Sequence, residues 1–132
     1  MKKIIFVYNA DGGILNGIKD LLHKNLSPKT YDCRLCAVTY DNFGMIREWK
    51  DFIQMLNVAT EFLHRDELKE QYQIKDVALP AALLQTEENQ LQIWISADEM
   101  NSCQNLSDLK QLVLQKLHNN TLEVLITSNV LL

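Results

Sequence analysis

The chain lacks any hydrophobic run that approaches the roughly 18 residues needed to span a bilayer. It also lacks an excess of basic residues, because 13 Lys and Arg stand against 17 Asp and Glu, for a net charge of −4. A protein of this charge does not neutralise many phosphates. The composition therefore argues against a membrane-spanning protein, and we expect neither a nucleic-acid partner nor a membrane partner.

Cysteine is scarce, with three residues in the chain, and an odd number fits poorly with a framework of disulfides. The initial Met-Lys-Lys superficially resembles the start of a signal peptide. However, only the five apolar residues 4–8 follow before charged Asp11, and no cleavage-type site is present. We therefore expect a cytoplasmic protein whose cysteines lie in a reducing compartment.

Proline and glycine are also few, with two and four residues, and no repeat, linker or low-complexity segment is present. A chain of 132 residues with 47% hydrophobic and 23% charged residues has the balance of a globular domain. We expect one domain over residues 1–132. Its β-rich end, residues 121–132, is expected to form an extra edge strand or a loose tail.

Hydrophobic periodicity predicts the helices and strands. Two helices are expected early in the chain: one after the glycine turn at residues 12–13, with Leu22 on its apolar stripe, and one over residues 45–56, with Trp49 on its apolar face. A short polar helix (66–72) and a longer helix (106–118) are expected later. The strands are expected over residues 3–8 and 58–64, from residue 81 after Pro80, and over residues 91–95.

The order of these elements predicts an α/β fold with a central mixed four-stranded sheet and helices on both faces. Crossovers through helices make the first strands parallel, and the tight turn at residues 87–89 makes the last two antiparallel. Leu91, Ile93 and Ile95 alternate with Gln92 and Trp94, so Trp94 is expected on the other face of the sheet. An exposed Trp94 would indicate a surface for a partner.

This order of elements resembles the thioredoxin-like fold, whose third strand characteristically follows a cis-proline. The matching bond is Leu79–Pro80, and the resemblance implies that Pro80 faces the site. The opening residues 7–11, Val-Tyr-Asn-Ala-Asp, resemble the start of small DCC-type thioredoxin-like proteins, which carry Tyr-Asp-Gly-Asp-Cys-x-x-Cys there. At the positions of those two cysteines this sequence has Gly12 and Leu15.

A Cys-x-x-Cys pair, Cys33 and Cys36, lies further along the chain, in an inserted segment whose residues 33–40 are expected to be extended or a loop. Such a pair performs thiol–disulfide exchange through a thiolate, which a helix N-terminus or a nearby cation favours. Arg34 offers a cation, but the residues after Cys36 show no helical pattern. We expect the two sulfurs to lie within reach of each other, at the same end of the sheet as Pro80.

Cys-x-x-Cys is also half of a tetrahedral zinc site. His23, at the end of the first predicted helix, and Cys103, beyond the fourth strand, are the candidate additional ligands. A third reading treats the cysteines as small hydrophobic residues in the core. The sequence thus favours a redox protein that acts on a protein or thiol partner through Cys33 and Cys36. The alternative is a non-enzymatic binding or adaptor module with a zinc site or packed cysteines.

Overall fold

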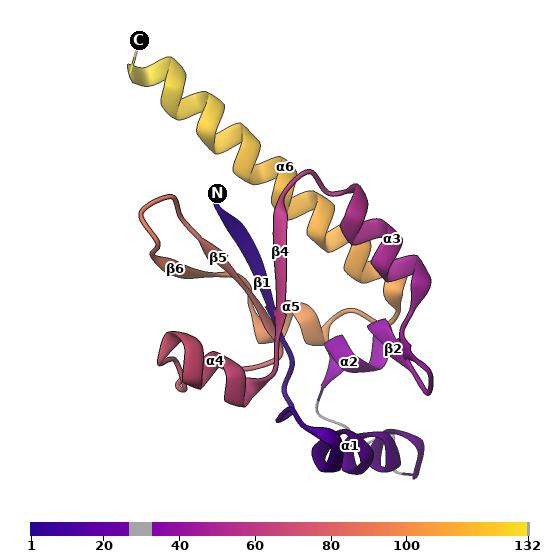
Figure 1. Cartoon of the computed structure of the whole chain (residues 1–132). Coiled ribbons are helices and arrows are strands. Elements are labelled where there is room, and N and C mark those ends of the chain that lie inside the picture. Colours follow the sequence, from indigo (N-terminus) through magenta and orange to yellow (C-terminus); the bar gives the residue numbers. More distant parts are fainter. Residues whose placement is uncertain (27–32, 132) are drawn as a thin grey trace.

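A mixed four-stranded sheet organises the computed structural model, which describes residues 1–26 and 33–131 (Figure 1). Helices pack around this sheet, and a small two-stranded sheet lies beside it. In chain order, the elements are β1 (Lys3–Val7), α1 (Ile14–Leu26), α2 (Arg34–Thr39), β2 (Tyr40–Asp41), β3 (Gly44–Met45), α3 (Arg47–Met55), β4 (Ala59–Leu63), α4 (Arg65–Tyr72), β5 (Ala81–Gln85), β6 (Leu91–Ile95), α5 (Ala97–Asn101) and α6 (Leu106–Leu131).

The strand order is β4-β1-β5-β6, with β1 at the interior of the sheet. β1 pairs parallel with β4 and antiparallel with β5, and β5 pairs antiparallel with β6. Val7, the last residue of β1, is opposite both Leu63 and Ala81. The mixed sheet, its strand directions and the start of β5 immediately after Pro80 confirm the predictions from sequence.

The side chains of β1 alternate between two apolar cores, one on each face of the sheet. Ile4 and Phe6 belong to the larger core, to which α2, α3, α5 and α6 contribute buried residues. Ile5 and Val7 belong to the smaller core, which Leu68 of α4 completes together with apolar side chains of the segment that follows this helix. Helices therefore cover both faces, as predicted, and β1 is a continuous apolar strand because both of its faces are buried.

The predicted alternation along β6 is wrong at its end. The register of β6 against β5 shifts between Ala82 and Leu83, so that Trp94 is an extra residue in the ladder. Ile93 is therefore opposite Leu83 on the smaller core and remains 60% exposed, whereas Ile95 is opposite Ala82 and is buried in the larger core. Trp94 is half-buried against that larger core.

Residues 34–39 form the helix α2, although an extended segment or loop was expected for residues 33–40. Four of its six residues, including Val38 and Thr39, are buried, so the sequence shows no polar stripe that would mark an amphipathic helix. Buried contacts with neighbouring helices favour this short helix over the β preference of Val38 and Thr39.

The end of the chain is also helical, because α6 continues to Leu131 rather than ending near residue 118. The prediction of an edge strand or loose tail over residues 121–132 is thus wrong as far as Leu131. No glycine or proline interrupts residues 106–131. A helix that has formed propagates at little cost through such a stretch, even where its residues prefer strands.

Two further expectations have opposite outcomes. The Leu79–Pro80 peptide bond is cis, as the resemblance implied. By contrast, Leu22 of α1, which the sequence analysis places on an apolar stripe, is 53% exposed.

Across the part of the chain that the structure describes, no helix has the length and hydropathy needed to cross a membrane.

Replacing Phe6 with alanine is expected to lower the free energy of unfolding by about 3–5 kcal/mol. The ring is fully buried and packs edge-on against Trp49 at 5.4 Å and stacked on Phe62 at 5.2 Å between ring centroids. Phe43→Ala, at a residue that is 99% exposed, is the matched control and should change stability by less than about 0.5 kcal/mol. Urea denaturation followed by circular dichroism measures both variants, and equal costs would contradict this account of the core.

Candidate functional site

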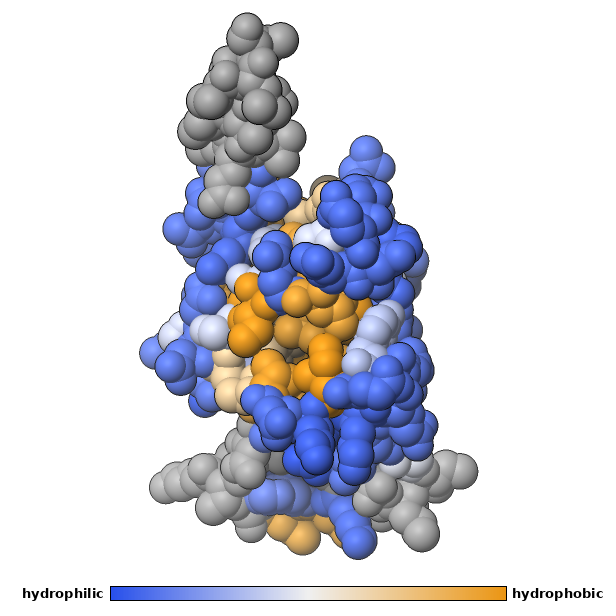
Figure 2. Space-filling view, turned by 90° about the vertical axis from the view of Figure 1, so that its left-hand side faces the viewer, coloured by the Kyte–Doolittle hydropathy of each residue, from blue (hydrophilic) through white to orange (hydrophobic). Residues whose placement is uncertain are grey.

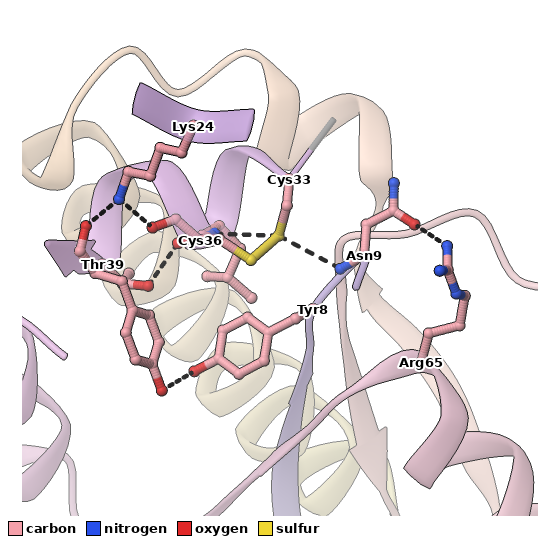
Figure 3. Close-up of a disulfide and its surroundings, with 9 residues drawn as sticks. Tyr8, Asn9, Lys24, Cys33, Cys36, Thr39 and Arg65 are labelled. Atoms are coloured by element: carbon pink, nitrogen blue, oxygen red, sulfur yellow. Dashed lines mark hydrogen bonds between the residues drawn. A yellow bond between two sulfur atoms is a disulfide. The ribbon is translucent and has the colours of Figure 1, made fainter. Parts of the chain in front are cut away.

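A disulfide between Cys33 and Cys36 lies at the carboxyl end of β1 (Figure 3). The two Cα atoms are 5.2 Å apart, so the expectation that the sulfurs lie within reach of each other is confirmed. Cys33 is the N-cap residue of α2, and Cys36 lies in the first turn of the same helix. The helix that the sequence did not reveal therefore positions both cysteines.

The sulfur of Cys33 accepts two backbone hydrogen bonds. The amide of Cys36 donates at 3.2 Å between nitrogen and Sγ, and the amide of Asn9, which follows β1, donates at 3.4 Å. Both contacts bring the positive end of an N–H dipole to one sulfur atom (Figure 3). Such donors stabilise negative charge on an acceptor, so they favour the thiolate once the disulfide is reduced.

Pro80 lies at the same end of the sheet as the disulfide. Ala81 is opposite Val7, so Pro80 is level with Tyr8, and the next residue of the chain is Asn9, whose amide contacts Cys33. This placement confirms the expectation about the end of the sheet. Pro80 is itself buried.

Two tyrosines and a lysine lie next to α2 and the disulfide. Tyr8 lies beneath the disulfide and donates a hydrogen bond from its hydroxyl to that of Tyr40 at 3.4 Å (Figure 3). Burial, together with this contact to Tyr40, raises the pKa of Tyr8, so its hydroxyl stays neutral.

Lys24 of α1 donates to the carbonyl oxygens of Cys36 and Tyr40. It thereby places a cation near the C-terminal end of α2, where the helix dipole is negative.

A polar network continues from the site across Asn9. The Asn9 side-chain oxygen accepts from Arg65 at 3.2 Å, and the Arg65 Nε donates to Asp11 at 3.0 Å. The hydrogen bond from Arg65 is the main cause that lowers the pKa of Asp11, whose side chain is 43% exposed. Because Asn9 both donates to Cys33 and accepts from Arg65, α4 helps to hold the loop that carries this amide.

Both cysteines are nearly inaccessible to solvent, with exposed fractions of 1% for Cys33 and 7% for Cys36. They belong to the larger core together with Cys103, whose thiol is free and 4% exposed. Burial is the main cause that raises the pKa of Cys103, and the negative charge of Asp108 adds to it. At neutral pH this thiol therefore remains protonated.

The hypothesis of a zinc site requires that His23 and Cys103 lie beside the Cys-x-x-Cys pair. His23 is an exposed residue in the last turn of α1, whereas Cys103 is buried just after α5. Among the described residues, no group of three or more His, Cys, Asp and Glu side chains has the arrangement of a metal site. The geometry thus offers the disulfide as the candidate site and adds no support for a four-ligand zinc centre.

No protein-family model, curated protein or solved structure matches the chain. The geometry of the site therefore carries the functional argument.

Sequence reasoning identified the two cysteines and Pro80 but missed the residues that surround them. From the sequence, Asn9 is predicted only as part of a turn, and Tyr8 only as part of a strand. Their position at the carboxyl end of a buried strand was the available signal, because such strand ends commonly border binding sites in α/β sheets. No sequence signal pointed to Lys24 or Tyr40, which meet α2 only in the folded chain.

In the oxidised protein, Cys103 is expected to react slowly with iodoacetamide at neutral pH. Its thiol is buried and its pKa is raised, so both access and the thiolate fraction are low. The matched control is the double variant S102C/C103S, which moves the thiol to the exposed neighbouring position. Mass spectrometry should find the control alkylated at least about tenfold faster, and comparable rates would contradict the burial of Cys103.

Proposed function

We propose that this chain is a small thioredoxin-like protein that exchanges disulfides with a protein or thiol partner, or senses redox state, through Cys33 and Cys36. The observation that carries the proposal is the pair of backbone N–H groups, from Asn9 and Cys36, that meet the sulfur of Cys33. The strand order β4-β1-β5-β6 and the position of Pro80 beside the end of β1 support the thioredoxin-like assignment. A cytoplasmic location and a single domain remain part of the proposal.

The proposed roles of the cysteines follow from their hydrogen bonds. Cys33 is the attacking thiol, because its sulfur is the one that both amides stabilise as a thiolate. Cys36, three residues along the same helix, is the resolving thiol, since its sulfur reaches Cys33 without a change of fold. Pro80 would shape the groove that receives the partner's sulfurs, as the thioredoxin-like resemblance implies.

In the reducing direction, the Cys33 thiolate attacks one sulfur of the partner's disulfide. That S–S bond breaks, a mixed disulfide forms, and the other partner sulfur leaves as a thiolate that takes up a proton. Cys36 then loses its proton and attacks the Cys33 sulfur. The second partner thiolate leaves, and two electrons have passed to the partner while Cys33 and Cys36 become the disulfide. The reverse sequence oxidises a partner dithiol.

A specific observation favours the second candidate function, a non-enzymatic binding or adaptor module. Cys33 and Cys36 are both buried among core side chains. A buried pair is typical of cysteines that stabilise a fold, and exchange would require local opening around α2 to admit a partner. In this alternative, the pair holds α2 in place or binds zinc instead of reacting.

The two candidates are separated by trapping the mixed disulfide in a background without Cys103. In reduced C36S/C103S, Cys33 is expected to react with an aromatic disulfide such as DTNB and to retain one thionitrobenzoate group. Reduced C103S should release two equivalents of thionitrobenzoate, because Cys36 resolves the mixed disulfide. Reduced C33S/C103S should react at least about tenfold more slowly, since Cys36 lacks the two amide donors.

Thiols that fail to react in the folded protein, or equal rates for the two single-cysteine variants, would contradict the proposed exchange. Metal analysis of the purified, reduced protein addresses the alternative directly. Stoichiometric zinc that is lost on Cys33→Ser would establish a metal-binding module, whereas the proposed exchange predicts a reactive dithiol without zinc.

A further inference from the structure

The strand β6 has one edge that pairs with no other strand among the residues that the structure describes. It is the last strand in the order β4-β1-β5-β6, and it lies on the outside of the sheet, away from α3 (Figure 1). Its sequence, Leu-Gln-Ile-Trp-Ile, contains no charged residue and no proline. Natural edge strands usually carry such residues, or a bulge, because these features hinder pairing with another chain. The bulge of β6 lies at Trp94, near the end of the strand, so residues 91–93 keep a regular edge. This edge therefore has the features of a strand that accepts a partner strand.

An apolar groove runs beside β6, between this strand and the segment that follows α4. It has a volume of about 360 Å³, and Ile74, Val77, Leu91 and Ile93 provide its apolar walls, with buried Leu83 at its base. Figure 2 views the molecule from the side of β6 and α4 and shows an apolar area framed by hydrophilic residues. Contiguous apolar areas with a polar rim mark interaction sites.

The charges at the two ends of β6 indicate the chemistry of its partner. Glu88 lies in the turn before the strand, and Asp98 lies three residues after the strand, in the first turn of α5. Both are exposed, and neither forms an ion pair with another residue that the structure describes. Their neighbours differ, because Glu87 pairs with the amino group of Met1 and Glu99 pairs with Lys116. Beyond each end of the strand there is thus an exposed carboxylate without an ion pair to a described residue, while the groove itself is lined by one cation and one carboxylate, Lys75 and Asp76.

We propose that β6 binds an extended segment of a partner protein as a fifth strand. The segment would carry apolar side chains at alternate positions, which enter the groove beside Ile93, and a Lys or Arg at each end, which meets Glu88 or Asp98. Main-chain hydrogen bonds supply affinity in this mode of recognition, and the pockets for alternate side chains supply specificity.

A second copy of this chain fits the same edge poorly. In a two-fold symmetric antiparallel pairing centred on Ile93, the turn that carries Glu88 in one copy approaches the start of α5, which carries Asp98, in the other copy at both ends of the interface. Like charges that approach each other in this way repel. The uncharged strand with acidic ends therefore selects a partner with basic ends over itself.

This docking surface is separate from the dithiol. The groove opens over the smaller core, to which Leu83 belongs, whereas Cys33 and Cys36 belong to the larger core on the opposite face. Strand addition at β6 therefore goes beyond the proposed exchange chemistry, and it should occur with the disulfide formed or reduced.

The test uses a fluorescein-labelled peptide, Lys-Val-Thr-Val-Thr-Val-Lys, and a matched peptide in which Glu replaces both Lys residues. Fluorescence anisotropy with the full chain should show that the Lys-flanked peptide binds at least about tenfold more tightly than the Glu-flanked one. Ile93→Asn should weaken binding about tenfold or more. Leu114→Asn, at an exposed apolar residue of α6, is the control and should leave binding unchanged. E88Q/D98N should remove the preference for Lys.

Hydrogen exchange provides the readout for strand pairing, because bound peptide should slow exchange of β6 backbone amides that face away from β5. The proposal is overturned if neither peptide binds, if both bind equally, or if Ile93→Asn has no effect. Unchanged amide exchange on binding would overturn it as well. A chain that dimerises, and whose dimer Ile93→Asn dissociates, would show that a second copy occupies the edge instead.

Discussion

The pairing of β1 with β4 on one side and with β5 on the other is the constraint on which the rest of the structure depends. It aligns Val7 with Leu63 and Ala81, so residues from three distant parts of the chain reach one end of the sheet. There the Asn9 amide meets Cys33, and the backbone of Arg65 donates to the carbonyl of Ala10. Because β1 is buried on both faces, a shift in its register would separate these groups.

The sheet was predictable from sequence because its signals are local and strong. The apolar run of β1, the Pro80 boundary and the tight turn before β6 each determine a strand within a few residues. The alternation along β6 was predicted wrongly because a bulge depends on how two strands meet. A sequence pattern of period two carries no sign of the extra residue Trp94.

The site was predictable only in part. The spacing of Cys33 and Cys36 identified the candidate pair, but the sequence did not predict α2, because buried contacts rather than a polar stripe determine its helical form. The same contacts place Cys33 at an N-cap, a position usually occupied by Ser, Thr, Asp or Asn. The cap is therefore a consequence of the tertiary fold, and so is the contact of the Asn9 amide with the sulfur, whereas the Cys36 amide belongs to the first turn of the same helix. In the proposed thioredoxin-like arrangement, α1 rather than the Cys-x-x-Cys segment is the additional element between β1 and the dithiol helix.

The central claim is that Cys33 and Cys36 form a reversible redox pair instead of a permanent cross-link. Equilibration of the C103S protein in glutathione buffers of known ratio, with the thiols counted by alkylation and mass spectrometry, measures the potential of this pair. The account predicts reversible reduction with a midpoint between about −270 and −120 mV, the range of thiol oxidoreductases. A pair that stays oxidised below about −300 mV, or that unfolds the chain when reduced, would contradict it.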